Sequence, residues 1–423
     1  MEREQKRVLK NGIELFSYKN PALHSFYISL FVRAGSMYEA EDESGITHFL
    51  EHVAIRNVNA TMGGDLYPLL DRYGIEFNAA TYSEMVQFYV SGAVANASVG
   101  AEVLSRVLSP IILSASEIAT ERDRIKAEIR ENDEQSSLAS FTSGIVHGGT
   151  TLSRPITGTI GSVNRINRSR LEEYRRRSFT RGNVFIYATG ALTDADIDML
   201  EDLFGGIELS DGEPRDNVAP VCAAFGRRTP IVHLKNADYT VVRFSFDLDM
   251  SRISVAESDL LYDILLGGYN SRFFIELSER RGIFYDLSGS CERYRNIGTL
   301  SFYYEVRSGA VSEAIGLTLS LLRDICEKSF DDAECMKAGY VDNAYMLYDD
   351  PRELNFTFAY DNHILAAGYE SLDERIESYR RVTPERLSEI AREVFRKENL
   401  TLTLKGSKKR IDQEALCALV NDF

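Results

Sequence analysis

Two histidines and a glutamate fall within residues 45–53, which read G-I-T-H-F-L-E-H-V. His48 and His52 are four residues apart, so on a helix their imidazoles share one face, one turn apart. Two imidazoles at that separation can hold one zinc ion, and Glu51 would lie beside the open coordination position, where it can act on water. The order H-x-x-E-H is the inverse of the commoner H-E-x-x-H zinc motif.

A structural role is the alternative for these histidines, because a histidine on an apolar helix face is often a hydrogen-bonded core residue. Phe49, Leu50 and Val53 do make the segment apolar. The chain has only six histidines, however, and two of them share this window with an acid at the catalytic spacing. The motif alone leaves both interpretations open.

The elements around the motif follow from local patterns. Asn11-Gly12 within residues 7–19 is typical of a hairpin turn, and Ser44 is expected to cap the helix that carries the histidines. We expect further strands at 25–33, 76–81 and 86–90, and helices at 66–73 and 97–108.

Residues 114–131 are expected to form a second important helix. Ser114 and Glu117 make a capping box at its start. Its apolar stripe consists of Ile118, Ile125 and Ile129. Glu121 and Glu128 lie beside the stripe, seven residues and therefore two turns apart. Acids in this place are either the solvated edge of the stripe or groups whose burial is compensated by a metal ion and a histidine.

An internal repeat predicts the architecture. Residues 166–190 and 382–406 align without a gap at an offset of 216, and each reads as a helix, a turn and an apolar strand. The aligned pairs are Arg170/Arg386, Leu171/Leu387, Glu173/Glu389, Arg176/Arg392, Phe179/Phe395, Asn183/Asn399 and Gly190/Gly406. We therefore expect an α+β fold of two homologous repeats, each a mostly antiparallel sheet with helices packed on one face.

The polar segment 210–217 is the natural linker between the repeats. We expect an N-terminal metal-binding domain at 1–209, a linker at 210–228 and a homologous C-terminal domain at 229–423. At the same offset, the positions that match His48, Glu51, His52 and Glu128 are held by Ile264, Gly267, Gly268 and Ala344. The second repeat is thus expected to lack a metal site.

The amino-acid composition disfavours some classes of function. The 423 residues are 44% hydrophobic and 26% charged, which is typical of a globular protein, and the net charge of −16 argues against nucleic-acid binding. No apolar run is long enough to span a membrane, and no apolar leader follows the first residues. Five scattered cysteines with no C-x-x-C favour a reducing, cytoplasmic location.

With these motifs in view, the chain resembles the pitrilysin, insulin-degrading-enzyme and mitochondrial-processing-peptidase family of inverted-motif zinc metallopeptidases over nearly its whole length. The resemblance rests first on G-S-M-Y-E-A-E-D-E-S-G-I-T-H-F-L-E-H at 35–52 and on G-I-E-F-N-A-A-T-Y-S-E at 74–84. Further similar segments are R-P-I-T-G-T at 154–159, G-G-Y-N-S-R-F-F at 267–274 and R-G-I-F-Y at 281–285.

The resemblance implies a site and a chemistry. Glu128 and Glu121 stand at the spacings at which the family places its third zinc ligand and a supporting acid. His48, His52 and Glu128 would then bind Zn²⁺, while Glu51 would act as the general base on water and Glu121 would orient a ligand. The implied function is a zinc-dependent endopeptidase that hydrolyses short unstructured peptides in an enclosed chamber.

The resemblance also implies how substrate is held. Asn78 and Ala79 would lie on a sheet edge where the peptide adds as a strand, and Tyr285 would contact the substrate from the second half. Family members pair that tyrosine with an arginine seven residues earlier, but Ser278 stands there in this chain. Chains of this length pair in the family, so a homodimer or a heterodimer with a related subunit is implied.

Two alternatives remain from the sequence. One is a non-catalytic structural subunit of the same fold, and the other is a maturation protease that removes leader peptides together with a partner subunit. The remaining histidines, none with ligand spacing, are expected to be structural: His24, His147, His233 and His363.

Overall fold

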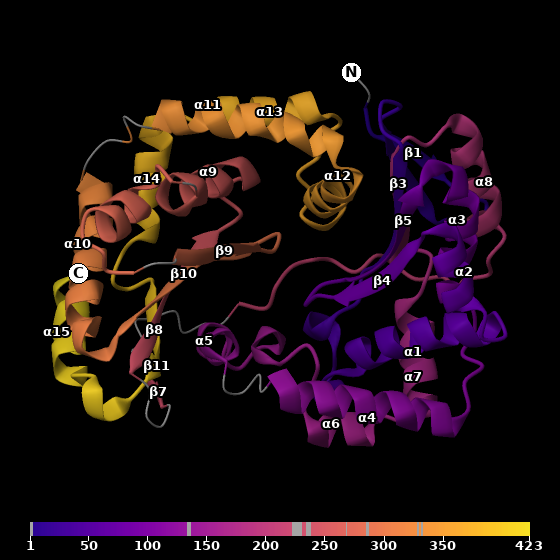
Figure 1. The fold of residues 1–423 in the computed structure, drawn as a ribbon, viewed down its shortest axis with the longest axis horizontal. Helices are drawn as coiled ribbons and strands as arrows, with labels where there is room; N and C mark the ends of the chain where they lie inside the picture. The colour runs from indigo at the N-terminus through magenta and orange to yellow at the C-terminus, as the bar shows by residue number, and fades with distance from the viewer. Residues whose placement is uncertain are drawn as a thin grey trace.

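The computed structural model describes residues 3–132, 137–221, 231–233, 238–267, 269–284, 287–327, 330 and 333–423. Within these ranges the chain forms two β-sheets that lie on opposite sides of the molecule, each with its own set of covering helices (Figure 1). The α+β class and the two similar halves expected from the repeat are confirmed. None of the helices in these ranges combines the length and the apolar character that a membrane crossing requires.

The first sheet has the strand order β1-β2-β6-β3-β5-β4. Its strands are β1 (Gln5–Val8), β2 (Glu14–Lys19), β3 (Ser25–Val32), β4 (Glu76–Thr81), β5 (Val86–Ala93) and β6 (Val184–Gly190). The helices of this half are α1 (Ile46–Thr61), α2 (Leu66–Tyr73), α3 (Ala97–Ser105), α4 (Ala115–Asn132), α5 (Leu138–Val146), α6 (Ile160–Arg165), α7 (Arg168–Ser178) and α8 (Asp194–Gly205). The hairpin at Asn11-Gly12 is confirmed, because β1 and β2 pair antiparallel across it.

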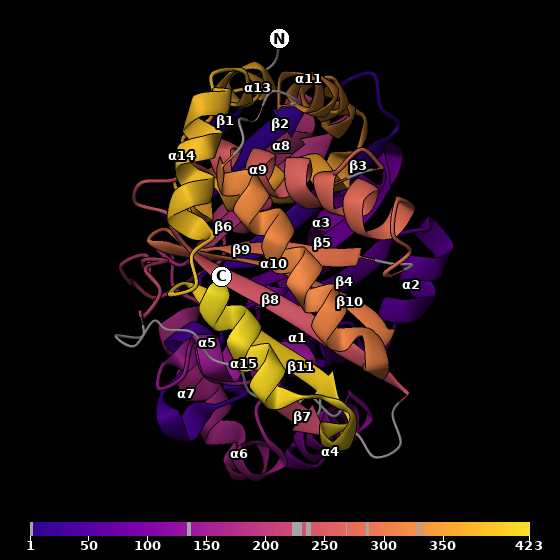
Figure 2. The same ribbon diagram turned by 90° about the vertical axis from the view of Figure 1, so that its left-hand side faces the viewer.

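The second sheet has the order β7-β11-β8-β10-β9, which repeats the order β2-β6-β3-β5-β4 of the first. Its strands are β7 (Ile231–His233), β8 (Tyr239–Asp249), β9 (Leu287–Arg293), β10 (Ile297–Arg307) and β11 (Leu400–Gly406). The helices are α9 (Val255–Leu266), α10 (Val311–Glu327), α11 (Ala333–Ala344), α12 (Pro351–Phe358), α13 (Leu372–Arg380), α14 (Pro384–Val394) and α15 (Gln413–Asp422), with π-helical turns η7 (Phe274–Glu279) and η10 (Ala359–Ile364). Figure 2 shows α10, α14 and α15 over the outer face of this sheet.

The aligned repeat forms the same structure twice. The helices α7 and α14 begin 216 residues apart, and side chains of the same role cap them, Asn167 in one and Thr383 in the other. Each helix leads into a buried strand, β6 or β11, that pairs in parallel with β2 or β7 and antiparallel with β3 or β8. All other pairs are antiparallel, so the mostly antiparallel sheets are confirmed.

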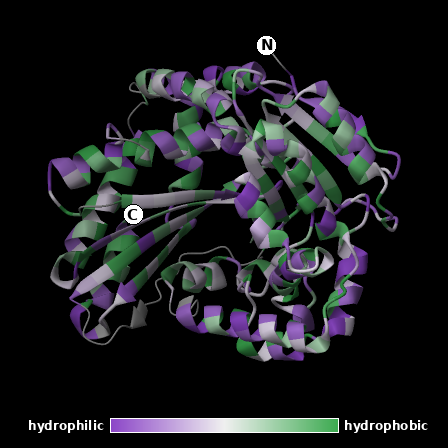
Figure 3. Cartoon of the chain, turned by 45° about the vertical axis from the view of Figure 1, so that its right-hand side comes forward, coloured by the Kyte–Doolittle hydropathy of each residue, from purple (hydrophilic) through white to green (hydrophobic). Residues whose placement is uncertain are grey.

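The two faces of the first sheet belong to different cores. Leu15, Ile28 and Leu30 pack with helices of their own half, whereas Phe16 and Phe31 join a core made mainly by the second half. This division follows the period-2 alternation of strand side chains. Hydrophobic residues recur along the strands of both sheets, while the helices show hydrophobic and hydrophilic stripes (Figure 3).

One helix of each half packs against the sheet of the other half, which the sequence patterns did not predict. The helix α5 lies against β11, where the Thr142 and Thr403 hydroxyls are 2.6 Å apart. The helix α12 lies against β3 and β6, where Asn355 accepts from Ser29 Oγ at 2.8 Å. We propose that the domains are still 1–209 and 229–423, joined by 210–228, with these two helices exchanged.

Candidate metal centre

The helix α1 carries the H-x-x-E-H motif and is anchored by its apolar side. Ile46, Phe49, Leu50 and Val53 are buried in the core of the first half. These residues recur at helical spacing, so the side that carries His48 and His52 is fixed relative to the core.

The start of α1 differs from the sequence expectation. Ser44 does not cap the helix: the N-cap position is Gly45, at a φ of 87°, with no side-chain cap bond. Instead, the buried carboxylate of Glu39 accepts hydrogen bonds from the backbone N–H groups of Gly45 and Thr47, each at 2.9 Å. An acid in this place satisfies free N–H groups of the first turn and opposes the positive end of the helix dipole. A Cβ at position 45 would lie 2.6 Å from the Thr157 carbonyl oxygen, so the positive φ and the contact both require glycine.

The helix α4 brings two acids to the histidines. Its capping box is confirmed, because the Ser114 backbone N–H donates to the Glu117 carboxylate at 2.8 Å and the Glu117 N–H donates to Ser114 Oγ at 3.3 Å. Ile118 and Ile125 are fully buried, which fixes the rotation of the helix. That rotation turns Glu121 and Glu128 toward α1.

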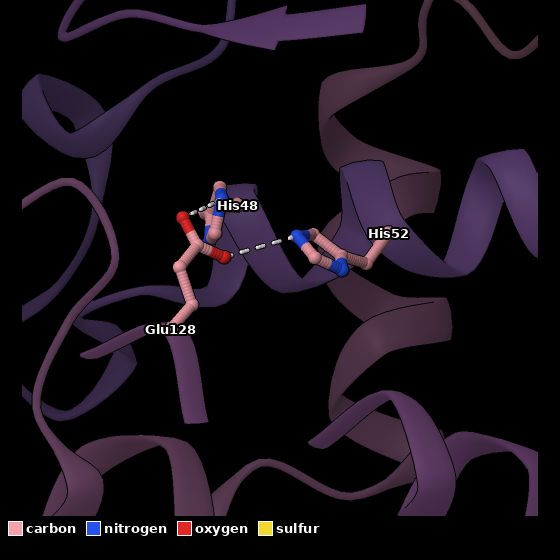
Figure 4. A group of neighbouring side chains, drawn as sticks. All are labelled: His48, His52 and Glu128. Atoms are coloured by element: carbon pink, nitrogen blue, oxygen red, sulfur yellow. Dashed lines mark ion pairs between the residues drawn. The ribbon is translucent and has the colours of Figure 1, made fainter. Parts of the chain in front are cut away.

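His48, His52 and Glu128 form one cluster (Figure 4). Glu128 Oε1 lies 3.7 Å from His48 Nε2, and Glu128 Oε2 lies 3.5 Å from His52 Nε2. One donor atom from each residue lies within 4.8 Å of the others. Two tetrahedral zinc ligands at bond lengths of about 2.1 Å are roughly 3.4 Å apart. The two carboxylate–imidazole distances are close to this value, so the three side chains could hold one ion.

The two imidazoles have different electrostatic surroundings. Burial, helped by the neighbouring His52, lowers the pKa of His48 to about 3, so this ring is in the neutral form that a metal requires. Burial alone would also lower the pKa of His52, but Glu121, Glu51 and Glu128 outweigh it and raise that pKa. The site is thus rich in negative charge, which favours a cation at its centre.

Glu121 is almost fully buried behind His52. Its Oε2 lies 3.7 Å from His52 Nδ1, the ring nitrogen that faces away from Glu128. Arg56 and Arg124 donate to its Oε1 at 2.7 and 3.1 Å. Burial would raise the pKa of Glu121, but His52 and the two arginines together lower it. An ionised acid on the far side of an imidazole is the arrangement that orients metal-binding histidines.

Glu51 lies beside the cluster, and burial raises its pKa. Its Oε2 accepts a hydrogen bond of 2.5 Å from Thr81 Oγ1 on β4. Glu51 and His52 line a cavity of about 760 Å³ together with Glu121 and Asn78. Glu51, which could transfer protons, and β4, the edge strand that could hold a peptide, therefore both line the same cavity.

Comparisons with known proteins agree with this geometry. The sequence profile described as insulinase, peptidase family M16, matches residues 15–160, and the profile described as peptidase M16 inactive domain matches 165–338. The chain belongs to peptidase family M16. The first match includes all of α1 and α4, while the profile called inactive includes positions 264, 267 and 268, where the sequence predicts that the metal site is lost.

Relatives match this chain in sequence, and solved structures match it in fold, over most of its length. The uncharacterized zinc protease YmxG of Bacillus subtilis is 24% identical over 400 residues, covering 91% of this chain and 94% of the relative. A protease from Helicobacter pylori has a similar structure, with a TM-score of 0.84 at 15% identity over 96% of this chain and all of that one. The periplasmic protease PqqL from Escherichia coli matches with a TM-score of 0.82 at 17% identity over all of this chain but 50% of its own length.

The residues expected to hold substrate in this M16 chain lie in two places, Asn78 and Ala79 next to α1 and Ser278 in the second half. Asn78 is exposed and Ala79 is partly exposed on β4, the last strand of the first sheet, and β4 contacts α1. Tyr285 lies outside the described residues. Ser278, which holds the position of the expected arginine, donates to the Phe284 carbonyl at 2.9 Å and lines another cavity of about 1040 Å³ with Arg281.

The second half of the M16 fold carries apolar residues where the metal site would be. Ile264 is buried in α9, Gly267 follows the end of that helix, and Ala344 is buried at the end of α11; Gly268 lies outside the described residues. Among the described residues, the only group of three ligand-type side chains placed to share a metal ion is His48, His52 and Glu128.

Sequence reasoning missed three residues of this site. Glu39 caps α1, Thr81 bonds Glu51, and Arg56 neutralises Glu121. Arg56 lies four residues after His52 on the same helix, so helical spacing could have revealed it. Thr81 falls in the N-A-A-T segment that carried the resemblance, but nothing local in the sequence connects it with Glu51.

Proposed function

We propose that this chain is a zinc-dependent endopeptidase in which His48, His52 and Glu128 hold the metal. The observation that carries the proposal is the spacing of their donor atoms, 3.5 and 3.7 Å from Glu128 to the two rings, with an acid and an edge strand beside them. Two nitrogens and one carboxylate oxygen leave a fourth position open, as catalytic zinc sites do. The names of the zinc proteases to which the chain is similar support the choice of metal.

The protein's own groups supply the proton transfers in this proposal. When bound, zinc supplies a Lewis acid that polarises the scissile carbonyl and makes water more acidic. Glu51 accepts a proton from the attacking water and passes it to the departing amine nitrogen. Thr81 holds the Glu51 carboxylate in place, and Glu121 fixes the orientation of the His52 ring.

The substrate in this proposal is an extended peptide. Asn78 and Ala79 lie on the edge strand β4, so a peptide can add to the sheet through main-chain hydrogen bonds. Pairing of this kind recognises backbone rather than side chains, so it favours short or unstructured peptides over folded proteins.

We also propose that two such chains pair to enclose a chamber, with Tyr285 acting on the substrate. The length of PqqL, which this chain matches over only half, supports an assembly of two units of this fold. Ser278 at the position of the expected arginine favours a partner that supplies the missing charge, and this also keeps open the related function of a leader-peptide protease with a second subunit. Four described cysteines without a disulfide, Cys291, Cys326, Cys335 and Cys417, support a reducing compartment such as the cytoplasm.

One comparison tests the peptidase function. The native chain and Glu51→Gln are purified, their zinc content is measured, and the cleavage of a fluorogenic unstructured peptide library is followed. We expect one zinc per chain in both proteins, and a loss of cleavage of roughly 100-fold or more in the variant, since general-base catalysis contributes about that much. Asp123→Asn is the matched control, because this acid lies on α4 but is exposed and pairs only with Lys126. Equal cleavage by the native chain and Glu51→Gln would contradict the proposed peptidase function and favour a non-catalytic structural subunit.

A further inference from the structure

A further polar cavity, of about 320 Å³, lies where the linker meets both halves. The cavity is lined by Arg33 at the end of β3, Arg215 and Asn217 of the linker, and Arg295 of the turn between β9 and β10. The last residues of η10 and Ala366 complete the lining. The cavity shares no residue with the metal centre. Its polar groups therefore form a separate site.

Arg33 brings a largely buried cation to this cavity without a carboxylate partner among the described residues. Its guanidinium donates to the backbone carbonyls of Gly182 and His363, each at 3.2 Å, and lies over the Phe185 ring. Burial lowers the pKa of Arg33, while Glu14 and Tyr38 raise it; Glu14 is itself paired with Lys6. Burying a charge that is only hydrogen-bonded to neutral groups is costly, so the site favours an anion.

Arg215 adds a second such cation. It donates to Ser178 Oγ at 3.0 Å and to the Arg33 carbonyl at 3.2 Å, and it lies over the ring of Tyr38. No described carboxylate pairs with it. Arg295 differs, because it forms an ion pair with Asp216. Of the charged side chains that line the cavity, three are arginines and one is an aspartate, so two positive charges remain uncompensated within the described chain.

Asn217 limits which ligands fit the cavity, because its amide oxygen needs a hydrogen-bond donor. The residue is 5% exposed, and its Oδ1 has no hydrogen-bond donor among the described groups. Turning the amide over would bring Oδ1 against the Ile364 carbonyl, which the Nδ2 group now faces at 3.5 Å. A complementary ligand must therefore accept from arginines and also donate to an amide oxygen.

We propose that this cavity binds inorganic phosphate. At neutral pH this anion keeps at least one P–OH group, which can donate to Asn217, while its other oxygens accept from Arg33 and Arg215. Sulfate has the same shape and charge range but no proton to donate, and a carboxylate lacks both the third oxygen and the donor. Phosphate in this place connects the first sheet, the linker and the second half, so its binding holds the two halves in one arrangement.

Anion titrations of the native zinc-loaded chain test the proposal without any use of its activity. Phosphate-free protein is titrated calorimetrically with inorganic phosphate, arsenate, sulfate, acetate and a phosphate monoester. We expect saturable binding of phosphate and arsenate, which share the acidic OH group, and at least about fivefold weaker binding of sulfate and the monoester, since a lost charge-assisted hydrogen bond costs about that or more. No saturable phosphate binding, or equal binding of sulfate, would overturn the proposal.

A variant separates this cavity from the metal centre, where phosphate could also bind. Arg215→Gln removes one cation of the cavity, and we expect it to weaken phosphate binding about tenfold or more while the zinc content is unchanged. Arg181→Gln is the matched control, because this nearby arginine pairs with the exposed Asp211 and lies outside the cavity. If Arg215→Gln binds phosphate as the native chain does, the anion lies elsewhere and the proposal is wrong. Should that variant not fold, phosphate is titrated into Glu128→Gln, which lacks one of the proposed zinc ligands: unchanged binding places the anion away from the metal centre, and lost binding overturns the proposal.

Discussion

Thr81 on β4 donates a hydrogen bond of 2.5 Å to the carboxylate of Glu51 on α1. The bond joins the edge strand on which we place the substrate to the acid that we propose as general base. Asn78 lies three residues earlier on the same strand, so the position of a bound peptide and the position of the carboxylate are set by one element. Thr81 is in this view a positioning residue for the proposed reaction.

Thr81→Val removes the hydroxyl group and keeps the shape of the side chain. We expect kcat for peptide cleavage to fall about 10-fold or more with KM and zinc content little changed, because a hydrogen bond to a charged group contributes about 1.5–3 kcal/mol. Thr81→Ser keeps the hydroxyl and should retain most of the activity. A valine variant with native kcat would show that Glu51 needs no such support.

Glu121→Gln tests the role of the buried acid behind His52. The amide removes the negative charge that faces His52 Nδ1 and leaves Arg56 and Arg124 less compensated. We expect the zinc affinity to fall by about 10–100-fold, as is typical when a group that orients a metal ligand is changed. Competition with a chromogenic chelator measures this affinity. Asp123→Asn, on the exposed face of the same helix, should bind zinc as the native chain does.

Local patterns explain why so much of the site could be predicted. His48, Glu51 and His52 lie on one helix, so their relation is fixed by spacing alone, and the stripe of isoleucines on α4 turns Glu121 and Glu128 to the same side. The repeat at 166–190 and 382–406 predicted the helix-strand units, because both copies keep the same apolar positions.

The missed features depend on contacts between segments that are far apart in the sequence. Glu39 replaces Ser44 at the start of α1 because the turn before the helix folds back over its first amides. Likewise, nothing in the local pattern of α5 or α12 shows which sheet each will cover. Their exchange is decided by partners in the opposite half, Thr403 for α5 and the Tyr187 carbonyl for α12.

Asn355 tests how strongly the exchanged helix α12 holds the halves together. It is fully buried, accepts from Ser29 Oγ and donates to the carbonyls of Tyr27 and Tyr187. Asn355→Leu removes all three of these buried hydrogen bonds, and we expect a loss of about 2–3 kcal/mol in the free energy of unfolding. Chemical denaturation followed by circular dichroism measures it. Glu353→Gln, on the exposed side of α12, should unfold like the native chain, and equal stability of both variants would contradict this role.

The bridge between Glu84 and Tyr360 predicts a specific pH dependence. The Tyr360 hydroxyl lies 2.7 Å from Glu84 Oε1 and 2.8 Å from the Arg293 carbonyl oxygen. A carbonyl oxygen can only accept, and the phenol has one proton, so both bonds form only when the Glu84 carboxyl is protonated and donates to Tyr360. Burial, with a smaller contribution from Glu292, raises the pKa of Glu84 to about 7, although hydrogen bonding with Tyr360 and the backbone lowers it.

The sign of the effect follows from proton linkage. The folded chain keeps the Glu84 proton up to about pH 7, while the unfolded chain releases it near 4.5. Between these values the folded state binds more protons, so the contribution of Glu84 to stability is complete below about pH 4.5 and is lost as the pH rises through 7. The full difference is on the order of 3 kcal/mol.

Glu84→Gln removes this titration while its amide can still donate to Tyr360. We therefore expect the variant to lose less stability than the native chain between pH 5 and 8, with the two denaturation curves closest at the acid end. The free energy of unfolding is measured by urea denaturation at each pH, and Glu353→Gln, which changes an exposed acid, should follow the native curve. Parallel pH profiles for the native chain and Glu84→Gln would mean that the Glu84 carboxyl is not the proton donor in this bridge.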